Sequence, residues 1–228
     1  TSGRSSWART LVRALSYNPR VRKRLLVGTL VILVAATAVG VWQARQARPL
    51  NVLLISIDTL RADRLGSYGY KPAQTPVLDR LAAGGVRFAQ VTTVAPLTLP
   101  AHASLLTGTF PAFHGVRDNG QFYLADDHVT LAEALKSSGY RTAGFVGAFV
   151  LDRRWGIAQG FDTYFDDFDL SKYQLAAGID AAQRPANEVV DKAIAWLQDA
   201  SQQPFFAWVH LYDPHAPYAA PESYASRF

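Results

Sequence analysis

A long uncharged segment, Leu25–Trp42, constrains this chain more than any other feature of its sequence. A helix over this segment would be roughly 27 Å long, which is close to the ~30 Å thickness of the hydrocarbon layer of a bilayer. Trp42 ends the segment, as expected for an aromatic residue at the membrane interface. A basic cluster precedes it, formed by Arg20, Arg22, Lys23 and Arg24. The sequence therefore predicts one transmembrane helix over residues 25–42.

The basic cluster also predicts the orientation of this helix. Basic residues stay on the cytoplasmic side, so residues 1–24 would be cytoplasmic, and everything beyond a linker at 43–50 would be periplasmic or extracellular. A buried core helix is one alternative, but such helices usually keep a polar face. A signal peptide cleaved near Ala36–Thr37–Ala38 is another. Because the charged stretch before the segment is long for a signal peptide, an uncleaved anchor is favoured.

The net charge of +5 is unevenly distributed along the chain. Residues 1–49 carry nine basic and no acidic residues, whereas the rest carries 14 basic and 18 acidic residues. The folded part is therefore slightly acidic, and no binding of nucleic acid is predicted. The chain has no cysteine, which excludes disulfides, thiolate metal sites and a cysteine nucleophile.

The two ends of the sequence suggest a fragment. There is no methionine, even at position 1, and the chain stops soon after a proline-rich turn. We therefore expect a chain cut at both ends and truncated on its C-terminal side.

Beyond residue 50, apolar strand patterns alternate with helix patterns. Two runs, Asn51–Ile57 and Phe205–Leu211, are continuously apolar, which is typical of buried strands in parallel sheets. Capping residues and periodic apolar residues predict helices over 76–83, from 98, over 131–136 and over 187–198. Strand-like composition predicts two further strands, over 86–93 and 141–146. This order predicts an α/β fold, a mostly parallel sheet with helices on both faces.

Three polar segments fall where a ligand would bind such a sheet. Asp58 follows the first predicted strand, and Asp213–Pro214–His215 follows the last. Ligands of open α/β sheets bind beyond the carboxyl ends of the strands. Thr98 stands at the start of an apolar helix, where free N–H groups and the helix dipole favour an oxyanion. The three segments therefore predict one anion-binding crevice.

Each of these residues also has an ordinary structural interpretation. Asp58 could cap a turn, Thr98 could be a helix N-cap, and His102 could be a core histidine with both nitrogens bonded. Asp213 and His215 could belong to a proline turn. The aspartates between residues 162 and 169 are interpreted as a solvated loop with aromatic anchors. His210 falls inside a predicted buried strand and receives no role.

Taken together, these residues resemble the sulfatase-like branch of the alkaline phosphatase superfamily. The resemblance runs from about Asn51 to Pro221, so that residues 51–228 are similar to the N-terminal part of the catalytic domain. It is carried by the blocks NVLLISIDTLRADRLGSYGY, TPVLDRLAAGGVRFAQ, TLPAHASLLTGTFPAFHGVRDN, LKSSGYRTAGFVG, GFDTY and HLYDPHAPY.

The sulfatase box of this family has a cysteine or serine that is converted to formylglycine, the nucleophile. Here Thr98 takes that position, followed by Pro100 and Leu106–Thr107–Gly108, and His102 takes the position of the box's substrate-binding arginine. A threonine cannot yield the formylglycine aldehyde. The box is instead similar to those of the superfamily's phosphodiesterases and phosphoethanolamine transferases, in which a metal-held threonine attacks phosphorus.

By this resemblance, Asp58 is a metal ligand, and Thr98 is both nucleophile and metal ligand. Asn119 matches an asparagine that binds a phosphoryl oxygen, and His215 matches a histidine near the substrate or its leaving group. The remaining ligands would lie beyond residue 228, and the fragment alone is expected to be inactive. Zinc is favoured over calcium, because Asp and His ligands suit zinc.

Two departures separate this chain from the usual sulfatase pattern. Thr59 follows Asp58, where sulfatases usually have a second aspartate. Residues 147–150 read Gly-Ala-Phe-Val, without the lysine and histidine of the family's Gly-Lys-x-His element. The missing lysine and histidine are the groups that would bind sulfate and protonate a leaving group, so the resemblance argues against arylsulfatase activity.

The resemblance implies a metal-dependent hydrolase of phosphate or sulfate esters, with the phosphodiesterase or phosphatase type favoured, and the apolar segment predicts that it is anchored in a membrane. One alternative is a transferase of phosphoethanolamine-type headgroups. The other is a catalytically inactive, sulfatase-like ectodomain that binds a glycan or a protein. The sequence predicts neither the natural substrate nor the oligomeric state.

Overall fold

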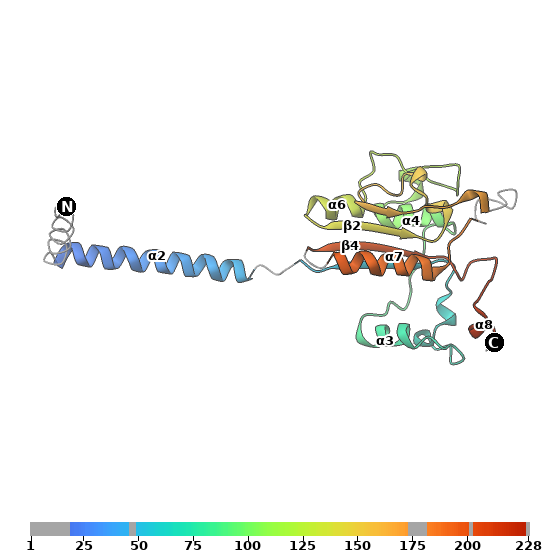
Figure 1. The fold of residues 1–228 in the computed structure, drawn as a ribbon, viewed down its shortest axis with the longest axis horizontal. Helices are drawn as coiled ribbons and strands as arrows, with labels where there is room; N and C mark the ends of the chain where they lie inside the picture. The colour runs from blue at the N-terminus through green and yellow to red at the C-terminus, as the bar shows by residue number, and fades with distance from the viewer. Residues whose placement is uncertain (1–18, 46–48, 173–181, 201–202, 227–228) are drawn as a thin grey trace, which may run out of the picture. The chain divides into compact units, whose positions relative to one another are not determined.

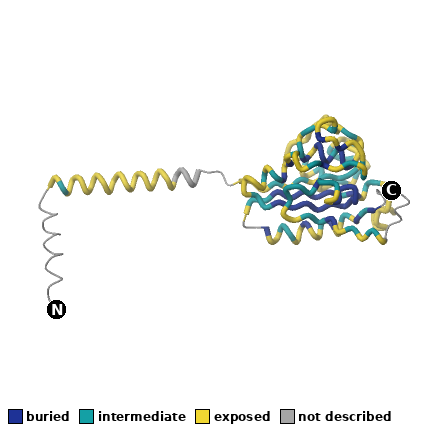
Figure 2. The backbone as a smooth tube through the Cα atoms, turned by 90° about the horizontal axis from the view of Figure 1, so that it is seen from above, coloured by how far each residue is buried: buried dark blue, intermediate teal, exposed yellow. Residues whose placement is uncertain are grey.

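A computed structural model describes residues 19–45, 49–172, 182–200 and 203–226. The chain divides into two compact units, Thr1–Pro49 and Leu50–Phe228. The first contains α2, Pro19–Arg45, whose large apolar side chains, such as Leu26 and Ile32, are exposed (Figure 2). Within the described ranges, α2 is the one helix long and apolar enough to cross a membrane, a property that signal sequences share.

The predicted segments around α2 are only partly described. Most of the basic segment 1–24 and the middle of the linker 43–50 lie outside the described residues. The division of residues 1–50 into a cytoplasmic segment, a membrane helix and a linker therefore stays a prediction.

The second unit is built on a parallel sheet in the order β1-β4-β2-β3. Its strands are β1, Val52–Ile57; β2, Arg141–Val146; β3, Thr163–Phe165; and β4, Phe205–Leu211. β4 inserts between β1 and β2 and pairs in parallel with both. The last strand in sequence therefore lies at the centre of the sheet, and its carboxyl end is flanked by those of β1 and β2.

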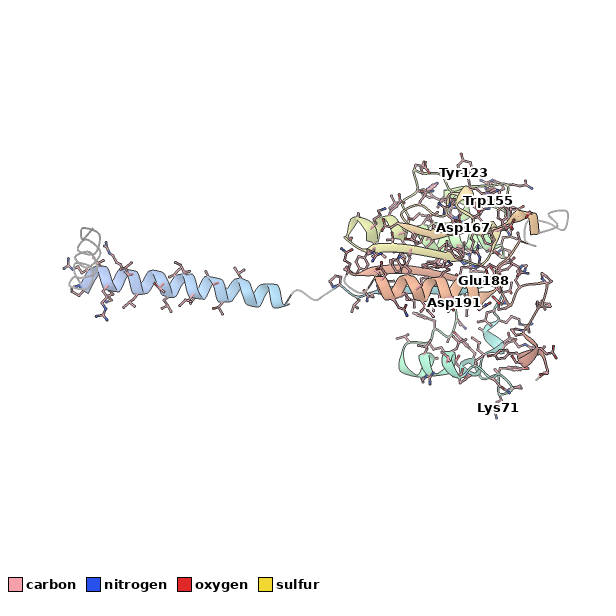
Figure 3. The ribbon with its side chains drawn as sticks, in the orientation of Figure 1. Lys71, Tyr123, Trp155, Asp167, Glu188 and Asp191 are labelled. Carbon is pink, nitrogen blue, oxygen red and sulfur yellow. The ribbon has the colours of Figure 1, made fainter. Side chains whose placement is uncertain are left out.

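Helices cover both faces of this sheet (Figure 1). On one face, Phe206 and Trp208 of β4 pack with α4, Thr98–Thr107, and α6, Leu131–Ser137. On the other, Ala143 and Val209 pack with α7, Ala186–Asp199. Glu188 and Asp191 belong to α7, whereas Trp155 lies across the sheet, against the first core (Figure 3). These two cores confirm the predicted α/β fold with both faces covered.

The helix α7 leaves part of its face of the sheet open. β1 is one of the two end strands of the described sheet, and Leu53 and Ile55 are 48% and 51% exposed. The alternate residues of β1, Val52 and Leu54, pack against the core on the side of α4. β1 therefore has one covered and one half-open face.

The remaining helical segments are short. They are α3, Pro76–Gly84; α5, Pro111–His114; α8, Glu222–Ala225; and the 3₁₀ turns Ala62–Arg64, Gly66–Tyr68, Phe149–Leu151, Arg153–Trp155 and Leu170–Lys172. The predicted capping box of α6 is present, since Thr130 Oγ1 accepts from Glu133 N and Glu133 Oε2 accepts from Thr130 N. The bounds predicted for the strands at 51–57, 141–146 and 205–211 and for the helices at 76–83, 98, 131–136 and 187–198 agree with the structure to within about two residues.

The strand predicted over 86–93 is wrong. These residues form no helix or strand, and the side chains of Val86 and Val91 are 82% and 77% exposed. A strand needs a neighbour to satisfy its backbone groups, and no strand of the described sheet pairs with this segment. Its apolar, β-branched composition alone does not supply that partner.

The loop predicted between residues 162 and 169 is also corrected in part. It contains the short strand β3, which pairs with β2. Asp166 is buried and receives hydrogen bonds from the Arg153 side chain and backbone N–H, and Asp162 accepts from the backbone N–H of Thr142. These carboxylates stabilise the local chain, so two of the four aspartates are not simply solvated.

We expect Gly156→Ala to destabilise the fold more than Gly115→Ala. Both glycines adopt a left-handed backbone conformation, with φ of 75° and 78°. An alanine at either position therefore costs about 1–2 kcal/mol of backbone strain. A Cβ at Gly156 would also collide with the carbonyl of Leu124, whereas nothing lies within 4 Å of a Cβ at Gly115. Overpacking adds about 1–3 kcal/mol. Denaturant unfolding of both variants checks this, and equal losses would contradict it.

Candidate active site

Asp58 lies directly after β1, at the carboxyl edge of the sheet. Its N–H continues the ladder by donating to the carbonyl of Leu211 at 2.9 Å, so the backbone fixes where the side chain begins. The next residue, Thr59, has φ of 51°, a left-handed conformation that is uncommon for a threonine. The chain therefore turns sharply at Asp58, and the carboxylate is left at the end of the strand with 9% of its side chain exposed.

Thr98 is the first residue of α4, after the extended Leu97. Its hydroxyl donates to Asp58 Oδ2 at 3.0 Å, which joins two residues 40 positions apart in the sequence. The proline at position 100 suits the first turn, because its missing N–H would have no partner there. The structure thus brings together the two residues expected to hold a metal, with the hydroxyl at the positive end of a helix dipole.

His102 is buried beneath this pair and has both ring nitrogens engaged. Its Nδ1 lies 2.7 Å from the carbonyl oxygen of Thr98, and its Nε2 lies 3.0 Å from Ser56 Oγ. The indole Nε1 of Trp208 donates to the same Ser56 oxygen at 3.0 Å. Since a carbonyl only accepts, Nδ1 carries the hydrogen and Nε2 accepts from Ser56.

This chain of hydrogen bonds runs in one direction, from Trp208 through Ser56 and His102 to the backbone of Thr98. His102 was predicted to contact substrate, but the structure places it on the buried face of α4 with no nitrogen left for a ligand. Its ordinary interpretation, a core histidine with both nitrogens bonded, agrees with this geometry. Its contact to Ser56 Oγ ties α4 to β1, and its contact to Thr98 O holds the first turn of the helix.

Asn119 lies at the same helix terminus. Its Oδ1 accepts the N–H of Leu99 at 2.9 Å, and the residue is partly buried. The side-chain oxygen of Asn119 therefore satisfies one of the backbone N–H groups in the first turn of α4 that have no partner within the helix. This places Asn119 next to Thr98, as expected for a residue that contacts the same ligand.

His215 lies beyond the end of β4. Its ring stacks on Tyr212 with centroids 4.3 Å apart, and its Nδ1 lies 2.7 Å from the carbonyl oxygen of Ala216. Asp213 accepts from the backbone N–H of Ala186, so it ties α7 to this turn. His215 belongs to the same edge of the sheet as Asp58, but no direct contact joins it to the Thr98–Asp58 pair in the described residues.

His210 is a site residue that the sequence interpretation missed. It lies on β4, and its Nε2 is 3.4 Å from Asp58 Oδ2. The register opposes it to Ser56, two residues before Asp58. The signal was present in the sequence, since a histidine interrupts an apolar strand one residue before its end. Only the pairing of β1 with β4 shows what this histidine contacts.

Two opposing effects set the pKa of the Asp58 carboxyl. Burial raises it, but hydrogen bonds from His210 and Thr98 outweigh burial, and the pKa lies below its usual value. Burial lowers the pKa of His210, with Asp58 opposing. At neutral pH the site therefore contains an ionised Asp58 carboxylate beside the neutral imidazole of His210.

The residues present fit a divalent metal only as part of its coordination. The Asp58 carboxylate and the Thr98 hydroxyl supply oxygen donors, which both zinc and calcium accept. Within the described ranges, no group of three His, Cys, Asp or Glu side chains could hold an ion. Asp58 Oδ1 makes no hydrogen bond to any described residue, so one oxygen of this carboxylate stays open.

We expect His102→Gln to make the fold less sensitive to acid. Burial lowers the pKa of His102 from 6.5 to about 3, so the unfolded chain takes up this proton first as pH falls. The contribution of neutral His102 to the free energy of unfolding is therefore fully present above pH 6.5 and is lost as the pH falls towards 3. Between pH 7 and pH 5 the wild type should lose about 2 kcal/mol more than the variant, measured by denaturant unfolding in metal-free buffer. An identical loss in both proteins would contradict the buried neutral state.

Comparison with known proteins identifies the family. The model of the sulfatase family matches residues 50–228. Arylsulfatase A of Bos taurus is 43% identical over 110 residues, which cover 46% of this chain and 22% of that protein. The ulvan-active sulfatase of Formosa agariphila is 32% identical over 201 residues, which cover 78% of this chain and 38% of that protein.

A solved structure agrees with the fold. The phosphonate monoester hydrolase of Agrobacterium radiobacter superposes with a TM-score of 0.64 at 28% identity, covering 79% of this chain and 44% of the other. The chain thus spans less than half the length of each of these proteins. The family match and the shared α/β fold lead to one conclusion. The chain belongs to the sulfatase family.

Proposed function

We propose that this chain carries the nucleophile half of a metal-dependent phosphoesterase site. The observation that carries the proposal is the hydrogen bond from Thr98 Oγ1 to Asp58 Oδ2 at the N-terminus of α4. It places a hydroxyl, a carboxylate and a helix dipole at one point, which is the arrangement needed to attack an ester of a tetrahedral anion.

In the proposed reaction, Thr98 Oγ1 attacks phosphorus in line with the leaving oxygen. The Thr98 hydroxyl gives its proton to solvent, a new Oγ1–P bond forms while the bond to the leaving group breaks, and water later cleaves the phosphothreonine to restore the hydroxyl. A bound divalent metal supplies Lewis acidity, which lowers the pKa of the hydroxyl and neutralises charge. Zinc is the metal we expect, with Asp58 and Thr98 among its ligands.

The other residues of the edge have supporting roles in this proposal. Asn119 orients a phosphoryl oxygen at the N-terminus of α4, where the remaining N–H groups favour the anion. His215, which follows β4 at the same edge of the sheet, is assigned a place near the substrate or its leaving group. His102 holds the backbone of Thr98 and leaves substrate contact to these two residues.

Phosphate is favoured over sulfate by the residue at the nucleophile position. Most of the similar proteins are sulfatases, but Thr98 cannot become the formylglycine that such enzymes use. The similar phosphonate monoester hydrolase shows that the fold also accommodates esters of phosphorus. We therefore propose phosphate mono- or diesters as substrates, with sulfate esters as the competing class.

The proposed enzyme is attached to a membrane by α2. The described length and exposed apolar surface of α2 support a transmembrane anchor, with the domain after it periplasmic or extracellular. A headgroup transferase of the same chemistry differs only in the acceptor of the phosphoryl group, an alcohol in place of water.

We expect Thr98→Ala to abolish turnover of bis-p-nitrophenyl phosphate by the full-length protein with zinc added. The substitution removes the attacking oxygen, so the loss should be at least ~10³-fold. Thr107→Ala is the matched control, because Thr107 lies at the other end of α4 and bonds to Ala103 O. It should keep near wild-type turnover.

The same assay separates the competing functions. Turnover of p-nitrophenyl sulfate but not of the phosphodiester would contradict the proposed substrate class. Unchanged activity of Thr98→Ala would contradict the nucleophile, and a wild-type protein without activity or metal binding would favour the inactive ectodomain.

A further inference from the structure

The buried histidine of β4 has a contact that core packing does not explain. His210 is fully buried, yet its Nε2 lies 3.4 Å from Asp58 Oδ2, a long hydrogen bond to the carboxylate of the site. Its ring meets that of His102 edge-on, with centroids 4.8 Å apart. An apolar residue would fill this position at lower desolvation cost. The imidazole therefore does something that a leucine could not.

The hydrogen-bond partners of His210 determine where its hydrogen lies. Nδ1 is buried and has no hydrogen-bond partner among the described residues. Nε2 faces a carboxylate, which only accepts hydrogen bonds when ionised. A hydrogen on Nδ1 would leave one buried donor unmet and point a lone pair at the carboxylate. His210 is therefore an Nε2–H donor to Asp58.

This donor gives the two oxygens of Asp58 different tasks. Thr98 Oγ1 and His210 Nε2 both donate to Oδ2, from α4 and from β4. Oδ1 receives no hydrogen bond from the described residues. Rotating the carboxylate away from this orientation would break both contacts, so one oxygen position is held by the two donors and the other is left open.

We propose that His210 is a positioning residue that fixes the rotation of the Asp58 carboxylate, so that Oδ1 is presented to the metal and Oδ2 holds the Thr98 hydroxyl. This inference rests on the proposed function, which makes Asp58 and Thr98 metal ligands. His210 contacts neither metal nor substrate and acts through Asp58.

The rival role, direct metal ligation by His210, fits the geometry less well. A histidine that ligates through Nε2 usually donates its Nδ1 hydrogen to a carboxylate, a carbonyl or water. Nδ1 of His210 has no such partner among the described residues. A donor to Asp58 needs no second partner.

Three variants of the full-length protein test the assignment. His210→Leu removes the donor, and His210→Gln replaces it with an amide N–H of similar reach. Phe206→Leu is the matched control, since Phe206 is fully buried on the same face of β4 but contacts Phe161 rather than Asp58. Zinc affinity is measured by competition with a chromophoric chelator, and kcat and KM are measured with bis-p-nitrophenyl phosphate.

We expect His210→Leu to weaken zinc affinity and to lower kcat, each about 10-fold, with little change in KM, because the altered residue supports a ligand. His210→Gln should recover most of both losses. Phe206→Leu should lower the unfolding temperature and leave zinc affinity unchanged.

The possible failures are distinguishable. Wild-type zinc affinity in His210→Leu overturns the inference and leaves the proposed function intact. Equal losses in the Leu and Gln variants overturn positioning in favour of ligation. Wild-type protein that neither binds zinc nor turns over the ester overturns the proposed function and this inference together.

Discussion

The parallel pairing of β1 with β4 is the interaction on which the rest of this structure depends. It joins residues 154 positions apart in the sequence and places Ser56 opposite His210. Because the two strands run in the same direction, Asp58 and His215 end at one edge of the sheet. Without this pairing, α4 would have no polar partner for Thr98, and the candidate site would not exist.

Directly behind the site lies a layer of polar groups in an otherwise apolar core. Trp208, Ser56 and His102 connect the centre of the sheet to the backbone of Thr98, while His210 connects it to Asp58. Buried polar groups must be paired, so such a layer specifies the relative placement of strand and helix more narrowly than apolar packing does. Thr98 is thus held at both its backbone and its side chain.

The sequence was informative wherever a local physical signal sufficed. Continuous apolar runs predicted β1 and β4, the capping pair predicted α6, and the strand end and helix start predicted that Asp58 and Thr98 share one crevice. What failed depended on distant partners. Residues 86–93 have the composition of a strand but no neighbour, and the role of His210 requires the β1–β4 register, which no local pattern reports.

The half-open outer face of β1 has a consequence for handling the protein. Among the strands that the structure describes, β1 stands at one end of the sheet, and its Leu53 and Ile55 are apolar and half exposed. An outermost strand with unpaired backbone groups and apolar side chains is a template for pairing with another chain. Domain preparations in which nothing covers β1 will therefore tend to self-associate through this strand. The same strand positions Asp58, so aggregation and the candidate site involve one element.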